Sequence, residues 1–175
     1  MITVRQERTG DARAREALLD EAFGETRYRK SSQRLRDGRL PAEGLCFIAA
    51  EGKRVLGTAR LWEITCPSGQ PALLLGPVAV AAGSRNRGIG AALVRRAIGE
   101  ADRLGHGAIV LVGEAPYYGR FGFSAEKTGR LRLPGPFERH RLLALELRQG
   151  ALDGARGMIR AAGRAIPQPA VAAAA

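Results

Sequence analysis

A loop rich in glycine and arginine is the part of the sequence whose residue types most plainly suggest chemistry. Arg85, Arg87, Gly88 and Gly90 follow an apolar segment and lead into a helical pattern over residues 88–104. Glycine lets a backbone approach a ligand closely, and the first turn of a helix has N–H groups without intrahelical partners. Guanidinium groups and the helix dipole both favour negative charge there. The segment therefore predicts an anion site that suits a pyrophosphate.

Three interpretations of this loop compete. A P-loop needs lysine and then serine or threonine after the glycine, and this sequence has Ala91 and Ala92 there, which excludes it. A dinucleotide fingerprint needs a small residue where Leu93 stands and normally follows the first strand of a parallel unit. Several antiparallel strands are expected before the loop, which disfavours that interpretation. An ordinary glycine-rich turn before a helix stays open on these residues alone.

Two motifs together resemble a known family. The run Arg85-Asn86-Arg87-Gly88-Ile89-Gly90 resembles the Arg/Gln-x-x-Gly-x-Gly/Ala signature of the GNAT superfamily of N-acetyltransferases. The run PYYGRFGF at 116–123 resembles the tyrosine-x-x-x-glycine-phenylalanine element of that family. The likeness covers residue 1 to about residue 160 and is greatest to the YhbS-like bacterial branch. It implies transfer of an acetyl group from acetyl-CoA to a primary amine of a small molecule or peptide, by direct attack in a ternary complex.

The resemblance also implies where acetyl-CoA, the cosubstrate, would bind. The side chain of Arg85 and a series of backbone N–H groups would hold the pyrophosphate: those of Arg87, Gly88, Ile89, Gly90 and Ala91. The pantetheine arm would pair with the backbone of Val78, Ala79 and Val80. Pro77 agrees with this, because a strand interrupted by proline has a bulge or a free edge. One of these strand amides would also polarise the thioester carbonyl.

Tyr118 matches the position of the general acid in the family. A phenol with a pKa near ~10 can donate a proton to a thiolate leaving group as its charge develops. The alternative is that Tyr118 is a buried anchor of a short helix. Tyr117 is expected to be a packing residue or part of the substrate wall.

Two carboxylates are candidates for the general base. Glu114 ends a predicted buried strand just before the tyrosines, and Glu63 lies on an earlier strand beside Trp62. Burial could raise either pKa into a useful range. A surface or structural role is the alternative for each, and a water chain could carry the proton instead. Many family members have asparagine after this strand, where this chain has Gly113 and Glu114, so the cofactor contacts there are expected to differ.

A basic segment, RYRKSSQRLRDGR at 27–39, has two interpretations. It is either a solvated basic helix, capped by Ser31 and Ser32 and ending near Gly38, or a lining of the acceptor cleft that selects an anionic substrate.

Composition limits the other classes of function. The chain has 175 residues, a hydrophobic content of 45% and a formal net charge of +11, which fits one compact domain that prefers anionic partners. Aromatic residues are only 5%, and no nucleic-acid motif is present, so a nucleic-acid-binding module is the weaker hypothesis. A GNAT-like domain that binds acyl-CoA without catalysis is a further alternative.

The same composition bears on metals, membranes and location. Two cysteines, Cys46 and Cys66, and two histidines, His106 and His140, predict neither a metal site nor a disulfide framework. The apolar runs have strand length and the N-terminus lacks a signal-peptide pattern, so a cytoplasmic protein without a membrane span is expected. A homodimer is possible by family likeness.

The apolar patterns predict a single domain of the α/β (α+β) class. Strands are expected at 2–7, 46–51, 55–64, 73–80, 108–114, 123–127 and 141–147, and helices at 11–23 and 88–104. The resemblance implies a mixed, mostly antiparallel sheet of about six or seven strands, splayed between the fourth and fifth and flanked by helices. The domain is expected to span residues 1–160, and residues 161–175 to form an alanine- and proline-rich tail that is disordered or lightly docked.

Overall fold

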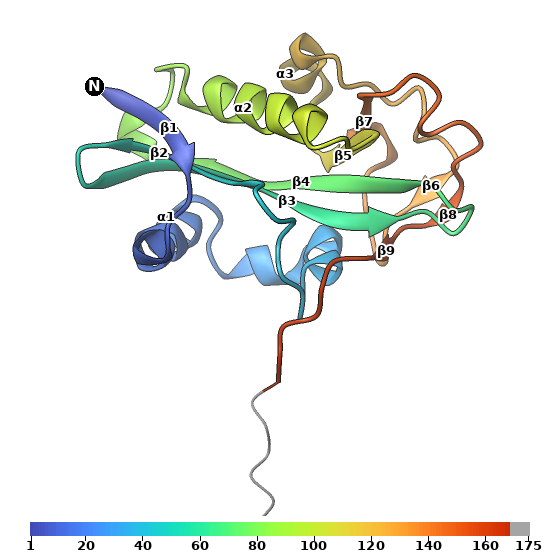
Figure 1. Cartoon of the computed structure of the whole chain (residues 1–175), viewed down its shortest axis with the longest axis horizontal. Coiled ribbons are helices and arrows are strands. Elements are labelled where there is room, and N and C mark those ends of the chain that lie inside the picture. Colours follow the sequence, from blue (N-terminus) through green and yellow to red (C-terminus); the bar gives the residue numbers. More distant parts are fainter. Residues whose placement is uncertain (169–175) are drawn as a thin grey trace, which may run out of the picture.

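A twisted sheet of seven strands organises the computed structural model, which describes residues 1–168. The strand order is β1-β2-β3-β4-β5-β7, and β9 also pairs with β3 (Figure 1). The strands are β1 (Ile2–Gln6), β2 (Cys46–Glu51), β3 (Arg54–Thr65), β4 (Pro71–Val80), β5 (Ala108–Val112), β7 (Leu142–Glu146) and β9 (Arg160–Ala161). A second, two-stranded sheet pairs β6 (Leu131–Arg132) with β8 (Gly157–Met158).

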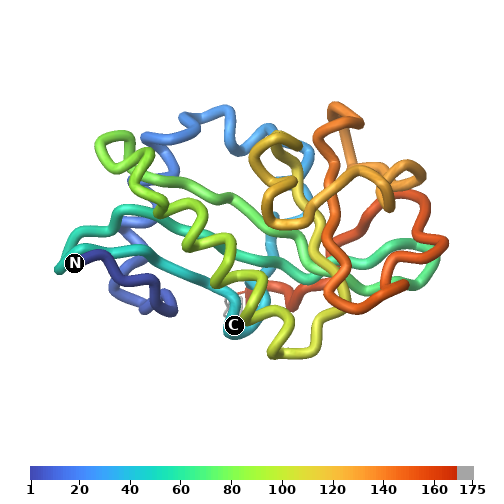
Figure 2. The backbone as a smooth tube through the Cα atoms, turned by 90° about the horizontal axis from the view of Figure 1, so that it is seen from above, coloured from blue at the N-terminus to red at the C-terminus, as the bar shows by residue number. Residues whose placement is uncertain are grey.

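Helices cover both faces of the sheet (Figure 1). The long helix α2 (Ile89–Arg103) lies across the strands on one face, and Figure 2 shows it from above. The other face carries α1 (Ala12–Phe23) and two short 3-10 turns, η2 (Glu25–Arg29) and η3 (Ser31–Leu35). The short helix α3 (Ala115–Tyr118) follows β5. Further 3-10 turns are η1 (Thr9–Asp11), η4 (Ala82–Ser84), η5 (Gly119–Phe121) and η6 (Arg139–Arg141).

Helical spacing of apolar residues fixes α2 on the sheet. Leu93, Ala97 and Ala101 recur every four residues and are fully buried against it. Gly57 of β3 permits the close approach, because a Cβ at this position would lie 2.9 Å from Leu93 Cδ1. Because Gly57 pairs with Val80, the last residue of β4, this contact places the first turns of α2 beside the end of β4.

The sheet opens between β4 and β5. These strands pair in parallel only at Leu73 with Ile109 and at Leu74 with Val110. Beyond Leu74, β4 continues to Val80 as an antiparallel partner of β3, with a register irregularity between Ala59 and Leu61. In residues 1–168, the edge of β4 that follows Leu74 therefore has no strand partner on its β5 side.

The expected fold class is confirmed, and so is a mixed, mostly antiparallel sheet with helices on its faces. The expected strand at 123–127 is wrong, because only Ser124 forms an isolated bridge, to Ala144. The chain turns away instead, and the Thr128 hydroxyl donates to the Leu142 carbonyl at 2.6 Å. The serine-capped helix is also wrong, since η3 is a 3-10 turn and the Ser31 hydroxyl donates to the Pro136 carbonyl.

Residues 160–166 form backbone hydrogen bonds with two other segments of the domain. β9 pairs with Ile64 and Thr65 of β3, so the expected division at residue 160 falls within a strand. The Leu40 N–H donates to the Arg164 carbonyl at 2.8 Å, and the Ile166 N–H donates to the Gly38 carbonyl at 2.9 Å. Residues 169–175 of the expected tail lie outside the described residues. The helices within residues 1–168 are too short or too polar to span a bilayer.

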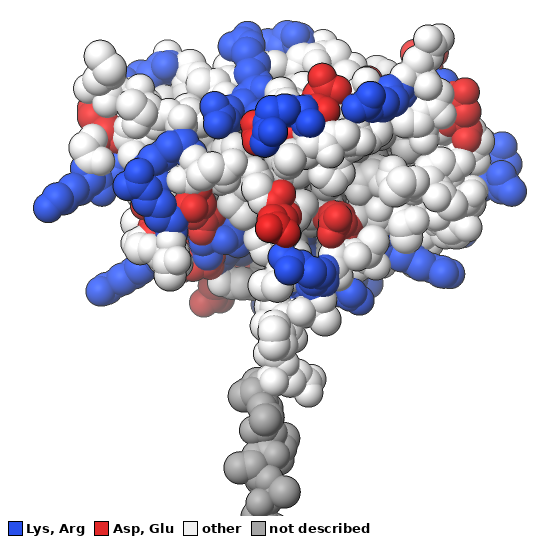
Figure 3. All heavy atoms as spheres, in the orientation of Figure 1, with Lys and Arg blue, Asp and Glu red and all other residues white. Residues whose placement is uncertain are grey.

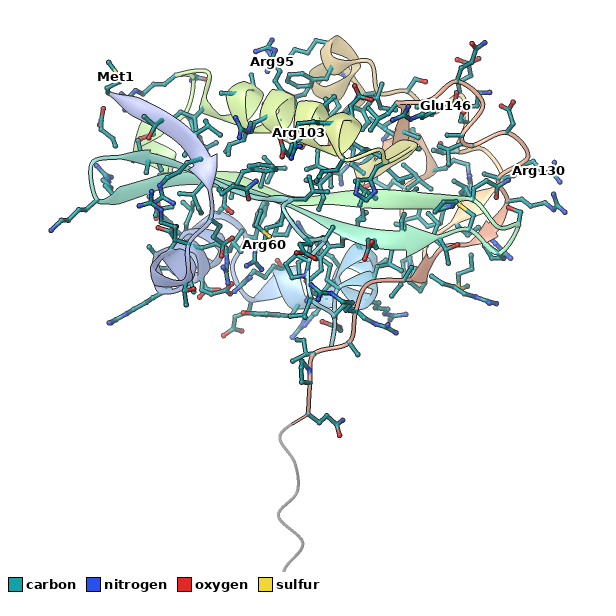
Figure 4. All side chains as sticks on the ribbon, viewed as in Figure 1. Met1, Arg60, Arg95, Arg103, Arg130 and Glu146 are labelled. Carbon is teal, nitrogen blue, oxygen red and sulfur yellow. The ribbon has the colours of Figure 1, made fainter. Side chains whose placement is uncertain are left out.

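A chain of ion pairs, buried where it begins at Glu7, connects the sheet with α1 and η2. The Arg60 guanidinium donates to both carboxylate oxygens of Glu7, at 2.8 and 2.9 Å, and Arg15 pairs with the same carboxylate. Figure 4 shows Arg60 on the face of the sheet that α1 covers. Arg15 also bonds Glu16 of α1, which accepts a bond of 2.7 Å from Arg27 of η2. Burial would raise the pKa of Glu16, but the bonds from Arg27 and Arg15 lower it.

Glu7→Ala tests this network. The Glu7 side chain is only 8% exposed, and its loss leaves two buried guanidinium groups without their shared partner. We expect the free energy of unfolding, measured by urea denaturation, to fall by about 3–5 kcal/mol. Glu51→Ala is the control, because its ion pairs are exposed and 3.6 Å long, and it should change stability by less than about 1 kcal/mol. Equal effects of the two substitutions would contradict a structural role for Glu7.

Candidate active site

The loop between β4 and α2 presents unpaired backbone amides. Gly88 is the N-cap of α2, with φ 74°, and Asn86 before it has φ 62°. Left-handed residues of this kind help to form concave anion sites from backbone N–H groups. The first backbone bond of the helix runs from the Ala92 N–H to the Gly88 carbonyl, so the preceding amides lack an intrahelical acceptor. This is the geometry that an anion needs at a helix start.

The side chains of this loop are open to solvent. Arg85 and Arg87 are exposed, and Arg87 Nη2 lies 3.6 Å from Glu51 Oε1 in a loose surface pair. Ile89 and Ala91, by contrast, bury their side chains in the core, so they could contribute only backbone groups. Arg85 and the amides of 87–91, which the resemblance implied as phosphate contacts, thus belong to one loop and helix start, and the Arg85 side chain is exposed there.

A cavity of about 660 Å³ begins where β4 and β5 part. Gly76, Pro77 and Val78 of β4 line one wall, and Val112 and Gly113 at the end of β5 line another. The remaining walls come from η2 and η3, from α3, and from the loop at 133–141. Of the three expected pantetheine contacts, Val78 lines this cavity, and Ala79 and Val80 continue the same unpaired edge of β4 toward α2.

Tyr118 lines the cavity and is held by packing. Its ring lies against Gly113, where a Cβ would approach Tyr118 Cδ2 to 2.7 Å, so glycine makes this placement possible. Tyr117 and Phe123 pack edge-on against the ring, with centroid distances of 4.9 and 6.0 Å. Burial raises the pKa of Tyr118 to about 12, with a smaller contribution from Tyr117 and an opposing one from Arg141. The phenol is therefore protonated at neutral pH.

Tyr117 connects the cavity with the phosphate loop. A Cβ on Gly90 would lie 2.8 Å from Tyr117 Oη, so the hydroxyl sits directly over the first turn of α2. Arg120 stacks over the Tyr117 ring at 4.4 Å, and Arg95 of α2 lies 5.4 Å from the ring centroid of Phe121. Figure 4 shows Arg95 on the side of α2 that faces α3. These contacts fix α3 beside the start of α2.

The two candidate bases differ in position. Glu114 lines the cavity, and its Oε1 lies 3.1 Å from Arg141 Nε, although the side chain is 66% exposed. Glu63, on β3, pairs with Leu73 of β4 and is absent from the cavity lining. The structure therefore does not bring Glu63 to the cleft. Trp62 is buried, and its indole N–H donates to the Gly76 carbonyl at 2.7 Å, which anchors the strand at the opening.

Several lining residues had no individual signal in the sequence. Arg36 is 8% exposed and lines the cavity, as do Lys30, Glu138 and Arg141. Burial lowers the pKa of Arg36 to about 10. The basic segment at 27–39 was the only sequence feature that indicated a cationic lining, and it did not show which of its side chains face the cavity. Residues 1–168 contain no cluster of three or more side chains suited to hold a metal ion.

The fold and the site together define a class of protein. A mixed sheet that parts between a fourth and a fifth strand, with helix-start amides at the mouth of the opening, is the expected GNAT architecture. Residues 12–123 match the family described as Acetyltransferase (GNAT) family. The chain therefore belongs to the GNAT family of acetyltransferases.

Solved structures support this assignment. The chain is similar to the GNAT family N-acetyltransferase YhbS from Escherichia coli, crystallised in complex with CoA: identity 26%, coverage 92% of this chain and 89% of that one, TM-score 0.77. A GNAT family acetyltransferase from Brucella melitensis, in complex with acetyl-CoA, has 24% identity, coverage of 96% and 92%, and a TM-score of 0.61. At that identity the second likeness shows the fold alone. No curated protein matches the chain.

The raised pKa of Tyr118 can be measured directly. We expect the tyrosinate absorbance of the wild type minus that of Tyr118→Phe to titrate with a midpoint of about 12. The pKa is raised in the folded state, so the related contribution to stability is complete below the ordinary pKa of 10.0 and is lost as the pH rises toward about 12. Circular dichroism in parallel reports whether the fold persists. A midpoint at the ordinary tyrosine value in folded protein would contradict the burial argument.

Proposed function

We propose that the protein transfers an acetyl group from acetyl-CoA to a primary amine by direct attack within a ternary complex. One observation carries the proposal: the unpaired edge of β4 leads from the cavity to the free amides at the start of α2. A ligand with a peptide-like arm and a pyrophosphate fits this arrangement. The ligands named for the two crystallised neighbours, CoA and acetyl-CoA, have both parts.

The chain offers matching groups along this path. We assign the pyrophosphate to the Arg85 side chain and the amides of 87–91, where the helix dipole favours anions. We assign the pantetheine arm to the backbone of Val78, Ala79 and Val80, whose edge toward β5 has no strand partner in residues 1–168. When bound, acetyl-CoA supplies an activated thioester. A β4 amide that donates to its carbonyl oxygen would favour attack by an amine.

Two residues at the cavity are suited to proton transfer. Tyr118 is protonated at neutral pH, as a tyrosine at its ordinary pKa is, and burial raises its pKa further, to about 12. It can therefore act as the acid for the departing thiolate. Glu114 lines the same cavity beside the tyrosine helix and can accept a proton from the incoming amine, directly or through water. Glu63 is not proposed as the base, because it does not line the cavity.

A nucleic-acid-binding role receives no comparable support. On the face seen in Figure 3, lysine and arginine side chains are scattered and acidic side chains lie among them, rather than forming a continuous basic stripe. Nucleic-acid sites rely on such stripes, because phosphate contacts supply most of the affinity.

Tyr118→Phe tests the acid. The substitution keeps the ring that packs on Gly113 and removes only the hydroxyl, so we expect kcat to fall by about 10²-fold or more, with acetyl-CoA affinity little changed. Thiol release with a panel of amines gives kcat, and calorimetry gives the affinity. Tyr28→Phe is the matched control, because Tyr28 is 57% exposed and does not line the cavity. An unchanged kcat in Tyr118→Phe would remove Tyr118 from the mechanism.

Arg85→Met tests the phosphate site. A charged hydrogen bond to a phosphate contributes about 1.5–3 kcal/mol, so the Kd for acetyl-CoA should rise about 10-fold or more. Arg13→Met, an exposed arginine on α1, is the control for net charge and should leave the Kd unchanged. Equal behaviour of the two variants would place the phosphates elsewhere. Wild-type protein that binds acetyl-CoA but acetylates no amine would instead support a non-catalytic acyl-CoA-binding domain.

A further inference from the structure

The cavity lining contains positively charged side chains that no carboxylate of the described residues pairs with. Arg27, Lys30 and Arg36 reach the cavity from the 27–36 segment, and Arg141 reaches it from the loop at 133–141. Arg27 is neutralised by Glu16 at 2.7 Å and Asp20 at 2.9 Å. Arg141 pairs with Glu114 and Glu138, so Lys30 and Arg36 are the cations of this lining without a carboxylate partner in residues 1–168.

Lys30 and Arg36 have no carboxylate within ion-pair distance among residues 1–168. Lys30 Nζ lies over the Phe23 ring, 4.4 Å from its centroid, at the rim of the cavity. Burial and the neighbouring charges of Arg36 and Arg141 lower the pKa of Lys30, so the cations of this lining repel one another. A bound anion would relieve that repulsion.

Arg36 gives the strongest indication of an anionic ligand. Its side chain is almost fully buried, and Nε donates to Gln33 Oε1 at 3.2 Å. The Gln33 amide is itself fixed by a bond of 2.7 Å from Nε2 to Asp37 Oδ1. Nη1 lies 3.5 Å from the place that a Cβ of Gly76 would occupy, so the guanidinium stands beside the point where β4 leaves β5. Nη1 and Nη2 have no hydrogen-bond acceptor in the described part of the chain.

The Arg36 Nη groups are not among the fully buried atoms without a partner in residues 1–168, so they are open to the cavity and free to donate to a ligand there. The planar fork of arginine matches a carboxylate, which accepts two parallel hydrogen bonds from it. Other elements of the lining carry Tyr118 and two carboxylates, Glu114 and Glu138, which pair with Arg141 at 3.1 and 3.8 Å. The lining therefore combines two cations without a carboxylate partner, Lys30 and Arg36, with carboxylates and a phenol that come from other elements.

We infer that Arg36 and Lys30 bind a carboxylate of the acceptor, so the acceptor is a small amino acid-like molecule whose amine points toward Tyr118 and Glu114. The inference rests on the proposed function and names the substrate class for the same site. A polycationic acceptor does not suit the cavity, because Arg36 and Lys30 would repel it. The apolar side chains of Leu133 and Phe137 in the lining suit a short carbon chain between the two polar ends.

Calorimetry with CoA-saturated protein tests the inference without turnover. The probes are N-acetylated ω-amino carboxylic acids of increasing chain length, each compared with its own carboxamide and with the N-acetylated aminoalkyl phosphate of matched length. We expect at least one carboxylate to bind about 10-fold or more tightly than its carboxamide. A panel in which no carboxylate exceeds its carboxamide, whether both bind or neither does, overturns the inference. Tighter binding of the phosphates than of every carboxylate also overturns it.

Substitutions test which residues cause the preference for a carboxylate over its carboxamide. Arg36→Met should abolish the difference between carboxylate and carboxamide, and Arg36→Lys should restore part of it, because it keeps the charge without the fork. Lys30→Met, at the exposed rim, should weaken carboxylate binding several-fold and provides a test that does not disturb the core. Arg29→Met is the matched control from the same segment, because Arg29 is exposed and does not line the cavity.

The failure of this inference can be separated from failure of the proposed function. Each variant is first titrated with CoA alone and melted to check its fold. If the wild type does not bind CoA, the proposed function fails and the inference fails with it. If CoA binds normally and a carboxylate preference survives in both Arg36→Met and Lys30→Met, only the assignment of the acceptor carboxylate is overturned.

Discussion

The parting of β4 from β5 is the constraint on which the rest of the structure depends. Backbone N–H and C=O groups need partners, and in residues 1–168 the two strands supply them to each other at only two positions, Leu73 with Ile109 and Leu74 with Val110. Beyond these, the edge of β4 faces a cavity, and the same strand ends close to the free amides of α2. The family to which the chain belongs transfers acetyl groups, and the proposed role of the open edge is to align the acetyl donor with an acceptor.

The surrounding elements keep this opening in shape. Gly57 lets α2 press onto β3, Gly113 lets the Tyr118 ring close one wall, and the indole of Trp62 holds the Gly76 carbonyl. The chain of ion pairs that begins at Glu7 connects the sheet to the segments that carry the cationic wall. The position of that wall thus depends on a network of ion pairs that begins at Glu7, 20 residues before Arg27 in the sequence.

Much of the fold could be predicted because it depends on local patterns. The repeat of Leu93, Ala97 and Ala101 marks α2, and the apolar run of β5 marks a buried strand. The placement of individual polar side chains could not be predicted, because it depends on contacts distant in sequence. Arg34 and Arg36 are two residues apart, yet Arg34 donates to the Pro134 carbonyl at the surface while Arg36 turns into the cavity. A 3-10 turn where a helix was expected changes which side chains face inward.

Hydrogen–deuterium exchange of backbone amides, with and without acetyl-CoA, tests the central claim most directly. The account predicts that bound acetyl-CoA protects amides at 78–80 on β4 and at 87–91 around the start of α2, while the β1–β2 pairing shows little change. Protection confined to other segments, or no protection in either of these two at saturating acetyl-CoA, would contradict it.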